Sequence, residues 1–98
     1  MAYRNRVDKN AAARRFMRGK MLRFRAIVIA AKAVPCFDCG RQFPSYVMDL
    51  DHRNPFLKKF TVSQGRNKTE ASLHAEIAKC DVVCANCHRE RTHGKARD

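Results

Sequence analysis

Two Cys-x-x-Cys pairs constrain the fold of this chain more than any other feature of its sequence. Cys36 and Cys39 form the first pair, directly followed by Gly40, and Cys84 and Cys87 form the second. A gap of two residues lets both thiolates of a pair point at one tetrahedral Zn²⁺. A chain of 98 residues buries a limited share of its surface, and a metal commonly completes so small a core. We therefore predict one structural zinc bound by the four cysteines. Unconnected pairs, or disulfides in an oxidising compartment, are the alternatives.

The separation between the two pairs indicates an insertion. Residues 40–83 lie between them, whereas a simple zinc ribbon has about 15–20 residues there. Residues 46–51 alternate weakly and favour a strand that leads into His52, and a turn follows at 53–55. The remaining pattern predicts a short strand at 60–62, a polar loop at 63–68, a helix at 69–79, an extended segment at 81–83 and a helix at 88–95. Cys80 has no obvious partner and is interpreted as a small buried apolar residue.

The N-terminal third is basic and has the composition of a helix. Residues 11–33 are rich in Ala, Arg, Met and Leu, and Pro35 ends the pattern, while Gly19 leaves open a division into two helices. An apolar stripe recurs at helical spacing through Met17, Met21, Phe24, Val28 and Ala31. Ten of the 21 Lys and Arg residues lie within residues 1–33, where Asp8 is the one acidic residue; this set includes Arg4, Arg6 and Lys9. A polyanionic partner is the simplest explanation, and a solubilising tail or a helix lying on a membrane surface are the alternatives.

The chain shows no sign of a membrane or secretory segment. Its longest apolar run, residues 26–31, is far shorter than the roughly 18 residues that a membrane span needs. The basic start is not followed by an apolar segment or a cleavage site typical of a secretory signal. We therefore expect no membrane partner and an intracellular protein, in which clustered cysteines stay reduced and more often bind metal.

A second group of metal-binding and acid-base residues flanks the cysteines. Asp51 and His52 lie within the insertion, and His88 directly follows the last cysteine. If one zinc joins the pairs, it brings Asp51 close to His88, and together they could hold a divalent ion that keeps positions open for water and phosphate. His52 projects to the opposite side of the strand and is a candidate general base. His93 is a further candidate ligand, although five residues from His88 is a poor helical spacing for a shared ion.

The order of these motifs resembles the zinc-containing HNH endonucleases, whose active site is the ββα-metal motif. The resemblance covers about residues 36–93 and rests on Cys36-x-x-Cys39-Gly40, Asp51-His52 and Cys84-x-x-Cys87-His88-x-x-Arg91-Thr92. It implies an α+β fold in which a small zinc-stapled ββα-metal (HNH) nuclease domain, residues 34–98, follows a basic helical DNA-binding extension, residues 1–33. One departure is that Lys79 stands where the family has an Asn that braces the loop. Asn54, Asn67 and Asn86 are possible substitutes.

The resemblance also implies a mechanism. His52 activates water, Asp51 and His88 bind the catalytic ion (Mg²⁺, Mn²⁺, Ni²⁺ or Zn²⁺), and the four cysteines bind structural zinc. The expected activity is hydrolysis of DNA phosphodiester bonds with little sequence specificity. The residues predicted to contact DNA are Arg14, Arg18, Arg25, Arg53, Lys58, Lys59 and Arg91.

Several properties stay open at this stage. The alternative function is a non-catalytic zinc-ribbon protein that binds DNA or RNA, and a protein-interaction role is a third hypothesis. The expected location is the cytoplasm of a bacterium or of a phage-infected host cell. A homodimer, or a larger nuclease or packaging complex, is compatible with the sequence, as are single-strand nicks and double-strand breaks.

Overall fold

The computed structural model describes the backbone of residues 2–97 and the side chains of residues 10–94. The side chains of Arg4, Arg6 and Lys9, predicted to be part of the basic extension, lie outside the described residues. These residues form three helices and two strands, in the order α1 (Ala2–Lys32), β1 (Met48–His52), α2 (Glu70–Ile77), β2 (Cys80–Cys84) and α3 (Ala85–Arg97), with short 3₁₀ helices at Ser45–Val47, Pro55–Leu57 and Val62–Asn67. The mixed α+β class predicted from the sequence is therefore confirmed.

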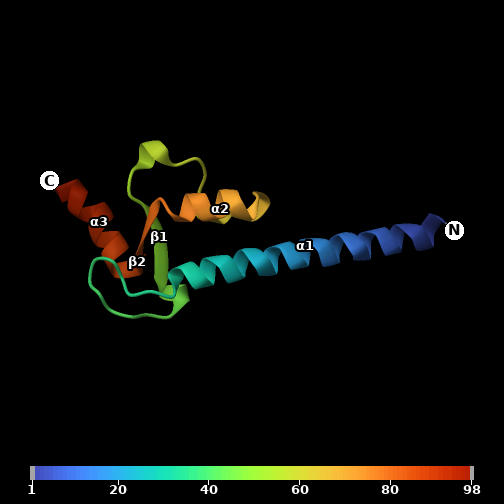
Figure 1. Ribbon diagram of the computed structural model, residues 1–98, viewed down its shortest axis with the longest axis horizontal. Coiled ribbons are helices and arrows are strands. Elements are labelled where there is room, and N and C mark those ends of the chain that lie inside the picture. The colour runs from blue at the N-terminus through green and yellow to red at the C-terminus, as the bar shows by residue number, and fades with distance from the viewer. Residues whose placement is uncertain (1, 98) are drawn as a thin grey trace.

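Helix α1 is one continuous helix that extends well beyond the rest of the chain (Figure 1). At 1.5 Å per residue its 31 residues span about 46 Å, which accounts for most of the 66 Å long axis of the molecule. Gly19 does not divide it, since a single helical glycine costs only about 1 kcal/mol relative to alanine. The helix ends at Lys32 because Pro35 disfavours the helical conformation at the residue before it.

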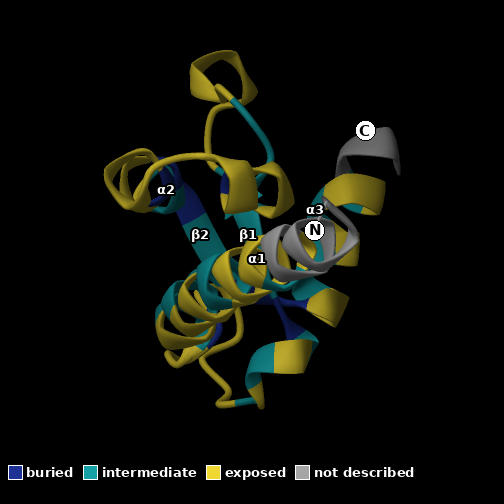
Figure 2. Ribbon diagram, turned by 90° about the vertical axis from the view of Figure 1, so that its right-hand side faces the viewer, coloured by how far each residue is buried: buried dark blue, intermediate teal, exposed yellow. Residues whose placement is uncertain are grey.

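The predicted apolar stripe of α1 is buried only in part, and Phe16, Leu22 and Ile29 outside the stripe are more than half exposed. Phe24 and Ile27, near its C-terminal end, share a groove with Gly65 and Leu73 of the 3₁₀ helix and α2. No described residue of α1 is fully buried, and Figure 2 shows the deepest burial around the strands and the adjacent helix α2. Of the predicted apolar stripe, Met17 is more than half exposed and the other four residues are half-buried.

The two strands form an antiparallel pair that joins the two cysteine segments. The register places Met48 opposite Cys84, Asp51 opposite Asp81 and His52 opposite Cys80. Cys36, Met48, Val83 and Cys84 form the buried core cluster, with Phe43, Val47, Val82 and Cys87 packed against it. Helix α3 begins at the residue after β2, which fixes its first turn beside the strands.

The part of the insertion between the two strands folds into helical structure. The prediction of a strand at residues 60–62 is wrong, because Thr61 and Gln64 cap a 3₁₀ helix. The backbone N–H of Gln64 donates to Thr61 Oγ1, and the N–H of Thr61 donates to Gln64 Oε1. This reciprocal pair is a capping box, and its Thr-x-x-Gln pattern was visible in the sequence. The predicted helix at 69–79 is confirmed as α2, which Thr69 caps through the N–H of Ser72.

Candidate functional site

The four cysteines of the two pairs form one cluster. Their sulfur atoms all lie within 4.8 Å of one another. Sulfur atoms bound to one tetrahedral Zn²⁺ at 2.3 Å are about 3.8 Å apart, so the set can hold such an ion after a small contraction. Among the side chains that the structure describes, it is the one cluster of three or more such ligands. The predicted metal ligands Cys36, Cys39, Cys84 and Cys87 are therefore brought together.

Backbone N–H groups prepare this cluster for a cation. Those of Cys39 and Cys84 lie 3.5 and 3.3 Å from the Cys36 sulfur, and that of Cys87 lies 3.4 Å from the Cys84 sulfur. Burial opposes ionisation of Cys36, but these donors outweigh it and lower its pKa to about 6. The hydrogen bond with Cys84, burial and the other sulfurs raise the pKa of Cys87 to about 12. The close approach of the four sulfurs thus favours an ionised Cys36 and opposes ionisation of Cys87, and a bound cation would offset the charge of further thiolates.

The chain geometry at the first pair follows from Gly40. Its φ of +74° is the left-handed conformation that glycine adopts without strain. The turn is closed by the N–H of Gly40, which donates to the carbonyl of Cys36, and by the N–H of Cys36, which donates to the carbonyl of Arg41. Cys80 does not join the cluster. It is buried beneath α2, where burial and the charge of Glu76 raise its pKa to about 11, which confirms its interpretation as a small buried residue.

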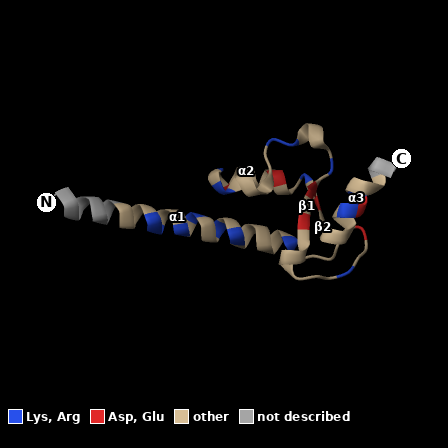
Figure 3. Cartoon of the chain, turned by 180° about the vertical axis from the view of Figure 1, so that it is seen from behind, with Lys and Arg blue, Asp and Glu red and all other residues tan. Residues whose placement is uncertain are grey.

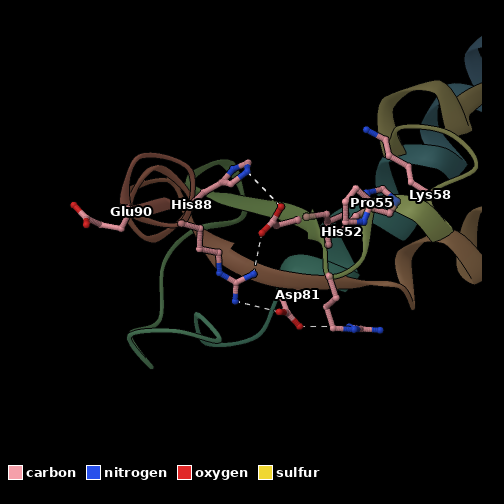
Figure 4. A pocket seen from close by; sticks show the side chains of 11 residues that line it. His52, Pro55, Lys58, Asp81, His88 and Glu90 are labelled. Atoms are coloured by element: carbon pink, nitrogen blue, oxygen red, sulfur yellow. Dashed lines mark hydrogen bonds and ion pairs between the residues drawn. The ribbon is translucent and has the colours of Figure 1, made fainter. Parts of the chain in front are cut away.

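A cleft of about 890 Å³ opens beside the cluster, between the strands and α3. Its lining includes Asp51, His52, Lys58, Asp81, His88 and Arg91. Figure 4 shows His88 and Glu90 at one end of this cleft, Asp81 below its centre, and His52 with Pro55 and Lys58 towards the other end. The candidate residues from three separated sequence segments thus share one cavity.

Asp51 and His88 meet as expected. Nε2 of His88 lies 3.6 Å from Oδ1 of Asp51, and its Nδ1 lies 3.0 Å from Oδ2 of Asp49. Two donors bound at 2.0–2.2 Å to one ion are about 2.8–3.6 Å apart, depending on the angle between them, so Asp51 and His88 could share a divalent ion with tetrahedral geometry. Carboxylate oxygen with imidazole nitrogen is a donor set for Mg²⁺, Mn²⁺, Ni²⁺ or Zn²⁺. Asp49 was missed, although its spacing of two from Asp51 places both on one face of the strand.

His52 lies on the other face of β1 and contacts α2. Its Nε2 lies 2.8 Å from Oε2 of Glu76, and only 10% of its side chain is exposed. Glu76 is 1% exposed, and it also accepts hydrogen bonds from Lys79 Nζ at 3.0 Å and from the N–H of Lys59 at 3.1 Å. Burial opposes the charge of this carboxylate, but the three donors together lower its pKa to about 2. Sequence reasoning missed Glu76, because a single Glu on a short helix looks like a surface charge.

Arg91 lines the cleft and is held by three carboxylates. It forms a bidentate pair with Asp38 at 2.6 and 2.7 Å, and it contacts Asp51 at 2.8 Å and Asp81 at 3.1 Å. The bond from Arg91 lowers the pKa of Asp38, and the carboxylates raise that of Arg91. Arg91 therefore neutralises the acidic side of the cleft in this structure, and its contact with phosphate stays a prediction.

The other predicted DNA-contacting residues lie in two places. Arg14, Arg18 and Arg25 are exposed on α1, along which Figure 3 shows basic residues distributed. Lys58 lines the cleft and Lys59 follows it on an exposed loop. Arg53 donates to the carbonyls of Ala78 and Cys80 and lies 3.4 Å from Asp81, so it also ties β1 to β2. His93 is exposed on α3 and belongs to no described metal-ligand cluster.

Comparison with protein-family models, curated proteins and solved structures found no match to this chain. Within residues 2–97, no helix is long and apolar enough to cross a membrane.

Proposed function

We propose that this chain is a metal-dependent DNA endonuclease of the HNH type, with residues 34–98 as the nuclease domain. The observation that carries the proposal is the shared cleft. Asp51 and His88 face one another there, His52 lines the same cavity, and the four-cysteine cluster ties together the segments that bear them. The antiparallel pair of β1 and β2 followed by α3 is the arrangement expected of the ββα-metal motif that the sequence resembles, with α2 and two 3₁₀ helices inserted between the strands.

The residues would divide the chemistry among them. Asp51 and His88 would hold a divalent ion, which when bound neutralises charge on the phosphate and on the departing 3′ oxygen. His52 would accept a proton from water as general base while the water oxygen attacks phosphorus. Lys58, exposed at the rim of the cleft, is suited to hold a phosphate of the duplex.

The exposed basic face of α1 supports DNA as the polyanion. Arg14, Arg18 and Arg25 are exposed on a helix that projects from the domain, where they can contact the phosphate backbone without reading base sequence (Figure 3). The same observation favours the second candidate function, a zinc-bearing module that binds nucleic acid without cutting it. The two candidates differ in turnover and not in binding.

A supercoiled-plasmid assay separates them. The zinc-loaded protein is incubated with plasmid and Mg²⁺, Mn²⁺, Ni²⁺ or Zn²⁺, with a chelator control, beside the variants His52→Ala and His74→Ala. His74 is exposed on α2, so its variant is a matched control for loss of an imidazole. We expect nicked or linear plasmid with the parent and with His74→Ala, and none with His52→Ala. Binding without cleavage by the parent under every ion would reject the nuclease in favour of the binding module.

A further inference from the structure

The contact between His52 and Glu76 joins two parts of the chain that the sequence keeps well apart. His52 is the last residue of β1, and Glu76 lies in the last turn of α2. The bond is 2.8 Å long, and the Glu76 side chain is 1% exposed. A buried carboxylate is costly unless it is fully paired, so this placement requires the donors that surround it.

The chemistry of Glu76 dictates which His52 nitrogen carries the proton. An ionised carboxylate only accepts hydrogen bonds, so Nε2 of a neutral His52 must be the protonated nitrogen that donates to Oε2. The other nitrogen, Nδ1, then carries the lone pair that can accept a proton. Among the described side chains no buried nitrogen or oxygen lacks a partner, and none of the described residues bonds Nδ1, so Nδ1 keeps access to solvent.

Hydrogen bonds from neighbouring residues fix the position of the Glu76 carboxylate. Lys79 Nζ donates to Glu76 Oε1 and also to the carbonyl of Leu57, and the N–H of Lys59 donates to Glu76 Oε2. These bonds fasten the loop after β1 to α2. Lys79 stands where the resembled family has an Asn that braces this loop, and its bond to the carbonyl of Leu57 is a contact with the same loop.

We infer that Glu76 is the positioning residue of His52: it holds the ring in one orientation and one tautomer, with Nδ1 turned to the water that is activated. This inference rests on the proposed function, because it assigns Glu76 a role in the same cleft. Glu76 is buried and does not line the cleft, so its effect on cleavage would pass through His52. Lys79 supports the arrangement by pairing with the second oxygen of the carboxylate.

The first test reads the tautomer directly. Long-range ¹H–¹⁵N NMR spectra of the zinc-loaded chain, recorded at a pH of about 8.5 so that imidazole is neutral, show which ring nitrogen is protonated. The signals of His52 are identified by their loss in His52→Ala. We expect the Nε2–H tautomer in the parent, and the Nδ1–H tautomer there would overturn the inference whether or not the protein cleaves DNA.

The second test compares cleavage of a short duplex by matched variants. Glu76→Gln can accept or donate, so we expect a mixture of His52 tautomers, a kcat lower by about 10–100-fold and an unchanged KM. Glu70→Gln is the control, since Glu70 is an exposed acid on the same helix. If Glu76→Gln does not fold, Glu76→Asp keeps the charge opposite Lys79 but withdraws it from His52, and the same losses are expected.

Two results separate this inference from the proposed function. If the parent cleaves and a folded Glu76 variant retains both the parent kcat and the Nε2–H tautomer, Glu76 does not position His52. If the parent cleaves no DNA with any ion, the proposed nuclease fails, and the tautomer spectra of the parent still decide whether Glu76 sets the state of the ring.

Discussion

Removing the metal from the four-cysteine cluster should unfold the domain. A chain of 98 residues has a free energy of unfolding of about 5–15 kcal/mol in total. Zinc binding at a four-ligand structural site provides an apparent 10–16 kcal/mol near neutral pH. Among residues 10–94 the buried apolar residues are Cys36, Met48, Leu73, Cys80, Val83 and Cys84, so two of these six belong to the cluster. Little core remains to hold the fold once the ligands separate.

Two cysteine variants separate the contribution of metal binding to stability from that of packing. Cys39 is exposed, whereas Cys80 is buried but lies outside the cluster. If packing alone determined stability, Cys39→Ala would be harmless and Cys80→Ala would be the damaging change. If zinc binding determines stability, Cys39→Ala is instead the more damaging of the two variants. Cys39→Ala should lose the metal and the cooperative transition, and Cys80→Ala should lose about 1 kcal/mol, or about 4–8 °C in Tm, with full zinc content.

Circular dichroism melts with and without a strong chelator, together with measured zinc content, provide the assay. The parent should show a cooperative melt that disappears when the metal is stripped and returns when zinc is added back. A melt that survives verified zinc removal would refute the reasoning. A Cys80→Ala protein less stable than Cys39→Ala would refute it independently.

Two further predictions concern the packing between Gly65 and α2 and the charge in the cleft. Gly65→Ala should lower the free energy of unfolding by about 1–3 kcal/mol, because the added Cβ would lie 2.6 Å from Leu73 Cδ1. Urea unfolding measures this change, with Gly94→Ala as the control because its added Cβ meets open space. Equal unfolding midpoints for the two variants would contradict the predicted clash. Arg91→Met should strengthen Mn²⁺ binding by about fivefold, since a unit positive charge beside Asp51 is removed and even a screened charge is worth about 1 kcal/mol. Isothermal titration calorimetry measures the affinity, and an unchanged or weaker one would show that Arg91 does not compete with cations for Asp51.

The four-cysteine cluster could be predicted because its spacing is local. Cys36 and Cys39 lie in one turn, so both sulfurs can reach the same point, and the strand that ends at His52 follows from alternation over a few residues. Asp51 and His88 could be paired once the two cysteine segments were joined. Each of these steps needs only a short window of sequence or one long-range link.

Glu76 and the residues around it could not be found in that way. On a helix of eight residues, a Glu followed three positions later by Lys79 is typical of an exposed ion pair. Its burial depends on where the loop after β1 returns to α2, which is a tertiary property. The strand predicted at residues 60–62 failed for a different reason: a short apolar run is ambiguous, and the capping pair Thr61 and Gln64 decides for a helical turn.

Successive side chains of β1 point to opposite faces of the strand, which explains why the insertion is long enough to include α2. Asp49 and Asp51 face α3 and His88, so His52, the next residue, must leave the strand on the opposite face. A lone imidazole there would have no partner from α3. The insertion returns the chain as α2 and places Glu76 against that face before β2 begins. A zinc ribbon with a short connection could still bind its metal. It would lack α2, however, and so would have no residue packed against the face of β1 on which His52 lies.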